Sequence, residues 1–333
     1  PISVDAAIDT VSPTTAKFTA VSGPVADAIA ALSEAARGSS DPAFAGLLRR
    51  EMGSLRKAAS LPCGLEAAYN LLSAAQGQSV AEAFLERRSP ASVIAPLRAA
   101  LEGAVAGAER QRIASAHDAV QKAFNTLNEE TPIGSVLAEL VPDIVGKSSP
   151  SILVFASESE RLLVETRFAD ASDTGRKLRR HLDRGFIVFA SVEELDGKLR
   201  GIEASAGKNS WKRLILVAPS LDWLSTLVTR AWLPETVWVV CEWNLVSRIA
   251  DTFHRLAGHP DISGSGQLGE RLAAFADAAR SERQARSVGS VELELEPHTS
   301  DSAPEMIIDL VDDDGDDDGE IILLSLATSR VIR

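Results

Sequence analysis

Four short, almost continuously apolar runs in the second half of the chain limit what it can fold into. They are SILVFAS (151–157), FIVFAS (186–191), RLILVAP (213–219) and TVWVVCE (236–242). Segments with helical spacing separate the runs, and SLDWLSTLVTRAWL is long enough to be a crossover helix. Strands that are apolar on both faces are typical of a parallel sheet covered by helices on both sides. We therefore predict an α/β domain over residues 150–288, with a Rossmann-like or RecA-like parallel sheet.

The residues before this domain predict only helices. After Ser22-Gly23-Pro24, apolar residues recur at helical spacing, alanine is the dominant filler, and Gly, Pro or Ser marks the breaks. The cluster at 146–150 then ends the pattern as a linker would. We expect an extended N-terminal segment over 1–22, an all-helical region over 23–146, and a domain boundary at this cluster.

The last part of the chain has a different composition. SVELELEP alternates as a strand does, and VDDDGDDDGE precedes the apolar run IILLSL. Asp314, Asp316, Asp318 and Gly319 match the opening of a calcium loop, but Ser325 stands where the loop requires a bidentate Glu. We interpret 289–333 as a short β-rich tail with an acidic loop, a composition that fits the start of a further domain.

Charge and cysteine content narrow the class of protein. The net charge of −13 argues against broad affinity for nucleic acid or anionic membranes, but it leaves room for a local basic face. Cys63 and Cys241 lie in unlike contexts and indicate neither a disulfide framework nor a zinc site. The first twenty residues lack the basic and apolar regions of a signal peptide, and the sequence contains no run of about 18 apolar residues. We expect a cytoplasmic protein without membrane contact. Because the chain begins with proline and ends just after a strand-like run, we expect it to be a piece of a longer polypeptide.

Polar residues follow each predicted strand. In parallel sheets, ligands bind at the carboxyl ends of the strands. Hydroxyls beside helix N-termini can bind an anion, although serine is also a common N-cap residue that needs no ligand. The residues at these ends are Ser157, Ser191, Ser220 and Glu242. They form a candidate ligand crevice, and helix capping is the competing interpretation for the serines.

Two features are candidates for nucleic-acid contacts. One helix of the helical region carries Arg49, Arg50, Arg56 and Lys57 at about one-turn spacing, as a phosphate-contacting face or an ordinary solvated face would. The tryptophans all fall between 211 and 243, where they either pack helices on the sheet or, for Trp243 and Trp223, help to line a base-stacking or partner surface.

The familiar catalytic and cofactor motifs are missing from the sequence. GSGQLG (264–269) matches a dinucleotide fingerprint but no strand precedes it, and there is no phosphate loop, GxSxG, CxxC or HExxH. We assign no catalytic residue, no metal site and no evident cofactor, and leave open whether the chain is an enzyme.

The order of these parts, with ILVFAS, FIVFAS, RLILVAPS and TVWVVCEWNLVSRI in succession, resembles the second RecA-like lobe of helicase-related prokaryotic anti-phage defence proteins of the DISARM type. The resemblance covers about residues 150–330 and implies a nucleic-acid-handling assembly. It implies ATP only if a lobe outside this chain supplies the phosphate loop. Arg248 is a candidate for the arginine that would reach the nucleotide, beside the acid Glu242.

Three functional hypotheses follow from these observations. The first is a helicase-like, catalytically silent accessory subunit or fragment that binds nucleic acid or a protein partner in a prokaryotic defence complex. The second is a protein-assembly scaffold that does not bind nucleic acid. The third is an enzyme or sensor that uses the strand-end crevice for a small anionic ligand such as a nucleotide.

Overall fold

The structure is a computed structural model, and it describes most of the chain up to residue 287. The described residues are 14–21, 23–103, 107–147, 150–195, 197–198, 211–230, 232–259, 262 and 266–287. Residues up to Arg283 belong to one compact unit, and a second unit runs from Gln284 to Arg333. The predicted β-rich acidic tail at 289–333 lies outside the described residues.

The predicted parallel sheet is present and has five described strands in the order β1-β5-β4-β2-β3. The strands are β1 (Thr15–Val21), β2 (Ser151–Phe155), β3 (Ile187–Ser191), β4 (Arg213–Val217) and β5 (Thr236–Glu242). All neighbouring strands run parallel. Because β3 and β4 lie on opposite sides of β2, the chain reverses direction across the sheet at β2, as in doubly wound folds.

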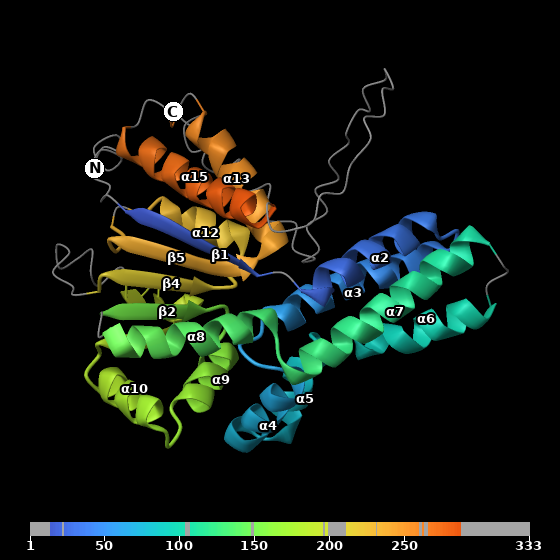
Figure 1. Ribbon diagram of the computed structural model, residues 1–333, viewed down its shortest axis with the longest axis horizontal. Coiled ribbons are helices and arrows are strands. Elements are labelled where there is room, and N and C mark those ends of the chain that lie inside the picture. The colour runs from blue at the N-terminus through green and yellow to red at the C-terminus, as the bar shows by residue number, and fades with distance from the viewer. Residues whose placement is uncertain are drawn as a thin grey trace, which may run out of the picture. The chain divides into compact units, whose positions relative to one another are not determined.

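Helices cover both faces of the sheet (Figure 1). On one face, Ile152, Leu214 and Val237 pack under α12 (Leu221–Val228), α13 (Trp243–Ala257) and α15 (Gln267–Ser287). On the other, Leu153, Phe155 and other strand residues pack under α8 (Pro132–Lys147), α9 (Glu158–Phe168) and α10 (Asp173–Asp183). Burial on both faces explains why four of the strands are apolar at almost every position.

The region predicted to be all-helical consists of helices where it is described. Its helices before α8 are α2 (Pro24–Gly38), α3 (Pro42–Ala59), α4 (Leu65–Gln76), α5 (Gln78–Glu86), α6 (Ala91–Gly103) and α7 (Ala108–Glu129). Asp41 caps α3 by accepting a hydrogen bond of 2.8 Å from the backbone N–H of Ala43. Fully buried leucines such as Leu32, Leu48 and Leu127 give these helices a core of their own.

Side chains connect the helical region to the sheet helices. Arg167 of α9 forms an ion pair of 2.6 Å with Glu130, the residue after α7, and also donates to the carbonyl oxygen of Pro62. The Thr131 hydroxyl donates to the carbonyl oxygen of Leu61 and accepts from the N–H of Gly134, in the first turn of α8. These bonds fix the helical region against the α8 and α9 side of the sheet.

The N-terminal segment supplies a strand that the sequence analysis did not assign to the sheet. Residues 15–21 form β1, which pairs with β5 from Thr15 opposite Thr236 to Val21 opposite Glu242. In the sequence, the helical region therefore lies between β1 and β2 of the sheet. The proposed domain division at 22, 146 and 288 stays a prediction.

A short turn separates α9 from α10 just before Gly175. The chain turns at 169–172, and Ser172 caps α10 by accepting from the N–H of Gly175. A Cβ on Gly175 would lie 2.2 Å from an oxygen of Asp170, so this glycine permits a close turn while belonging to the helix.

Candidate functional site

The three serines of the predicted crevice all cap helical turns. Ser157 accepts from the N–H of Glu160 at 3.3 Å, Ser191 from Glu194 at 3.3 Å, and Ser220 from Trp223 at 3.2 Å. These bonds satisfy backbone donors that an anion at a helix N-terminus would otherwise bind. The geometry therefore favours the capping interpretation for each serine.

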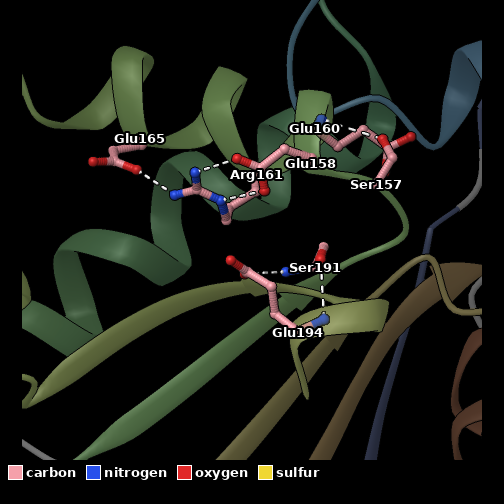
Figure 2. A network of polar contacts seen from close by, with 7 residues as sticks. All are labelled: Ser157, Glu158, Glu160, Arg161, Glu165, Ser191 and Glu194. Carbon is pink, nitrogen blue, oxygen red and sulfur yellow. Dashed lines mark hydrogen bonds and ion pairs between the residues drawn. The ribbon is translucent and has the colours of Figure 1, made fainter. Parts of the chain in front are cut away.

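A reciprocal capping box closes the end of β3 (Figure 2). The carboxylate of Glu194 accepts a 3.0 Å hydrogen bond from the N–H of Ser191, while Ser191 caps Glu194. The end of β2 has the same Ser-x-x-Glu spacing in Ser157 and Glu160, and the backbone of Ala156 hydrogen-bonds Glu160. The two VFAS-like runs thus end in similar local structures.

Carboxylates crowd around a single guanidinium beside these caps. Arg161 donates to Glu158 and, at 2.7 Å, to Glu165, as Figure 2 shows. The hydrogen bond with Glu158 raises the pKa of Arg161 above its ordinary value, and the charges of Glu165 and Glu194 act in the same direction. An anionic ligand at the ends of β2 and β3 would meet this excess of negative charge.

Glu160 is buried at the boundary with the helical region. Its side chain is 6% exposed, and its carboxylate lies 3.4 Å from the guanidinium of Arg88, which follows α5. Burial raises the pKa of Glu160, and the nearby charge of Arg88 opposes that rise. Arg88 is itself held over the ring of Phe84, with 3.8 Å from its guanidinium carbon to the ring centroid. An ion pair between Arg88 of the helical region and Glu160 of α9 therefore occupies the space beside the carboxyl end of β2.

The end of β5 is built differently. Glu242 stands at the N-cap position of α13, but its side chain makes no capping hydrogen bond. Burial raises the pKa of Glu242, while the charge of Arg56 and a 3.3 Å hydrogen bond from Asn244 lower it. The structure thus brings together Arg56 and Glu242, two residues that the sequence analysis placed in separate candidate sites.

The remaining predicted site residues lie on helix surfaces. Arg49, Arg50 and Lys57 are exposed on α3, and Arg248 is exposed on α13. Trp243, the first residue of α13, is half-buried against the hydrophobic core of the sheet. The other tryptophans also pack against the cores of the sheet faces, which favours the packing interpretation.

One cationic surface was missed by the sequence analysis. Helix α10 and the residue after it present five exposed cations within nine positions. They are Arg176, Lys177, Arg179, Arg180 and Arg184. The string RKLRRHLDR was the available signal, but the exposed side of the helix depends on how its leucines pack.

An open hollow of about 690 Å³ lies between α2, α7 and the start of α13. Ile29 and Ala30 form part of its apolar wall, and Arg37, Arg112 and Asn244 part of its polar wall. Arg112 also lies 3.5 Å from the carbonyl oxygen of Gly38. Of the predicted crevice and nucleic-acid residues, none lines this hollow.

The described residues offer little conventional catalytic chemistry. Burial raises the pKa of Cys63 to about 12 and raises that of Cys241 as well, so both remain thiols rather than nucleophilic thiolates. Among the residues that the structure describes, no group of three or more His, Cys, Asp and Glu side chains could hold a metal ion. Within the same residues, no helix has both the length and the apolar character needed to cross a bilayer.

Comparisons with known proteins add no functional assignment. No family model matches the sequence, and no curated protein matches it.

Proposed function

We propose that this chain is a helicase-like, catalytically silent accessory subunit or fragment that binds nucleic acid in a prokaryotic defence complex in the cytoplasm. The observation that carries the proposal is the set of exposed cations on α3, namely Arg49, Arg50 and Lys57. In a chain with a net charge of −13, such a local cluster gives phosphate groups a place to bind despite the overall repulsion.

The carboxyl edge of the sheet supports a silent role. The serine hydroxyls cap helical turns, and Glu160 and Glu242 face arginines from the helical region. A nucleotide at the ends of β2 and β3 would also meet the carboxylates around Arg161. ATP binding would therefore depend on a phosphate loop from another lobe.

The apolar surface argues against the scaffold hypothesis. Protein interfaces usually centre on well-packed apolar and aromatic side chains. Among the described residues, Val80 is the one large hydrophobic side chain that is exposed, at 41%. A polyanion, which binds through charge, fits this surface better than a protein partner with an apolar core.

The test is fluorescence anisotropy with labelled single- and double-stranded DNA across a salt series, with and without ATP. We expect binding that weakens steeply with salt and does not require ATP. The variant Arg49→Gln, Arg50→Gln, Lys57→Gln should bind more weakly, and its log–log salt slope should fall by up to about 0.9 per lost phosphate contact on duplex DNA.

A matched control removes the same number of charges from scattered exposed positions, with Lys122→Gln, Lys147→Gln and Arg255→Gln. The control should retain most of the affinity if the α3 cluster acts locally. Absence of wild-type binding to either form of DNA at low salt would refute nucleic-acid binding. Equal weakening of both variants would show that net charge, rather than the α3 cluster, controls affinity.

A further inference from the structure

Helix α10 carries the densest run of exposed cations in the described part of the chain. Five of the nine residues from 176 to 184 are Arg or Lys, all are exposed, and Asp183 is the one acid among them. The stretch is therefore strongly positive within an acidic protein.

Four of the five cations lie opposite the side of the helix that packs on the sheet. Leu178 is fully buried, and Leu182 packs against the same core. At 3.6 residues per turn, Arg176, Lys177, Arg180 and Arg184 fall within an arc of roughly 100°, on the side away from both leucines. From Arg176 to Arg184 this stripe is about 12 Å long, at about 1.5 Å of rise per residue.

Two of the five cations form hydrogen bonds or ion pairs with residues at the start of the helix, and the other three have side chains that can contact a partner. Arg176 pairs with Asp173 and donates to the carbonyl oxygen of Ala171, and Arg179 donates to the carbonyl oxygen of Ala169. The side chains of Lys177, Arg180 and Arg184 make no hydrogen bond or ion pair with any residue that the structure describes. Their charge is not neutralised within the described part of the protein.

We propose that this stripe of α10 binds the phosphate backbone of double-stranded nucleic acid. The inference rests on the proposed function and names a surface and a form of nucleic acid for it. A duplex presents one negative charge per about 1.7 Å of axis, so the roughly 12 Å stripe faces several phosphates at once. Arginine, which predominates here, can contact phosphate oxygens with two parallel hydrogen bonds.

The absence of a stacking platform favours a duplex over a single strand. Sequence-tolerant binding of single strands relies on aromatic side chains that stack on the bases. The aromatic side chains nearest in sequence, Phe168 and Phe186, pack against the sheet core, and the ring of His181 lies against Phe186. Among the described residues of α10, none offers an exposed aromatic ring.

The packing of the leucines argues against a membrane as the partner. A helix that lies on a bilayer inserts an apolar face between the lipids. In α10 the apolar residues Leu178 and Leu182 already pack on the sheet, so the exposed side offers charge alone. Anionic vesicles therefore serve as the competing probe in the test.

The test uses the full chain and the variant Lys177→Gln, Arg180→Gln, Arg184→Gln, which leaves the hydrogen-bonded Arg176 and Arg179 in place. Anisotropy with a labelled random-sequence duplex is measured from about 50 mM to about 200 mM salt. If all three cations contact phosphates, the slope of log affinity against log salt concentration should be shallower for the variant than for the wild type by about 2.7. Over that salt range the wild type then loses about 40-fold more affinity than the variant does. The wild type should also bind the duplex more tightly than a single strand of equal length.

The control variant Lys122→Gln, Lys147→Gln, Arg255→Gln carries the same net charge and should keep nearly the wild-type slope. Equal melting temperatures for all three proteins would show that the fold is retained. If the wild type binds duplex DNA and the α10 variant has the same slope and affinity, the α10 proposal is wrong while the proposed function stands. If the wild type binds no DNA at low salt, both fail. Loss of binding to phosphatidylserine vesicles in the α10 variant, with DNA binding unchanged, would assign the surface to membranes instead.

Discussion

Two kinds of local structure follow the strands at the carboxyl edge of the sheet, one after β2 and β3 and another after β5. At β2 and β3, Ser157 and Ser191 cap the following turns, and Glu160 is buried against Arg88. At β5, Glu242 occupies the N-cap position of α13 without making a capping bond, and its carboxylate instead accepts a 3.3 Å hydrogen bond from the exposed Asn244 side chain. The same edge is therefore locally satisfied at one end and incompletely satisfied at the other.

This difference shows how the helical region is joined to the sheet. An arginine of the helical region interacts with a glutamate at each end, Arg88 with Glu160 and Arg56 with Glu242. Burial raises the pKa of both glutamates, so each arginine offsets part of the cost of placing a carboxylate at the boundary. We expect the pair at β2 to matter more for stability, because Glu160 is almost fully buried.

The largest expected effect is the loss of the Arg88 charge. Arg88→Met keeps an apolar side chain over Phe84 but leaves the carboxylate of Glu160 without its cation. Removing one partner of a well-buried ion pair costs about 3–5 kcal/mol, and we expect about 2–3 kcal/mol here because the Arg88 side chain is 20% exposed. By contrast, Arg56→Met should cost less than about 1 kcal/mol, as for partly exposed pairs. Urea denaturation would measure both.

Arg87→Met is the matched control, because Arg87 is the exposed neighbour of Arg88. It should change the free energy of unfolding by no more than about 0.5 kcal/mol. Adding Glu160→Gln to Arg88→Met should recover part of the loss, since no unpaired charge then remains buried. Equal losses for the Arg88 and Arg56 variants would contradict the comparison between the two ends.

The main strands of the sheet were predictable because burial on both faces leaves a local record in the sequence. β2, β3, β4 and β5 each correspond to one of the apolar runs. The strand β1 leaves no such record, because only three of its seven residues, Phe18, Ala20 and Val21, are buried. Its pairing with β5 also joins segments more than two hundred residues apart, as the register of Val21 with Glu242 illustrates.

The candidate site likewise has features that a local sequence pattern predicts and features that depend on contacts between distant residues. The Ser-x-x-Glu spacing that caps the ends of β2 and β3 is local, and the sequence analysis named helix capping as one of the two interpretations for these serines. The contact between Arg88 and Glu160 spans 72 positions, and no local pattern predicts it. For α10 the cations were readable, but their alignment on the free side follows from the burial of Leu178.

Substitutions at the two N-cap positions should change the free energy of unfolding in opposite directions at β3 and β5. Ser191→Ala removes a hydroxyl that accepts from the N–H of Glu194 and should lower the free energy of unfolding by about 1 kcal/mol. Ser191→Gly should lower it by only a few tenths of a kcal/mol, because glycine is tolerated at this cap position. Glu242→Ser places a good cap where the side chain makes no capping bond and should stabilise by about 0.5–1 kcal/mol. Thermal unfolding would measure each. Destabilisation by Glu242→Ser would mean that its pairing with Arg56 contributes more than a new cap does.

The smallest expected effect is a change in how stability depends on pH. A carboxyl group whose pKa is higher in the folded state than in the unfolded state binds more protons when folded. Its contribution to the free energy of unfolding therefore falls as pH rises from the unfolded pKa to the folded pKa. Burial raises the pKa of Glu160 and of Glu242, so wild-type stability should decline relative to Glu160→Gln or Glu242→Gln across this window and run parallel to it at higher pH. Denaturation at a series of pH values from about 4.5 upward would measure the differences. Because Glu160 is the more deeply buried, its variant should show the clearer divergence, and a divergence of the opposite sign would mean that Arg88 outweighs burial at the end of β2.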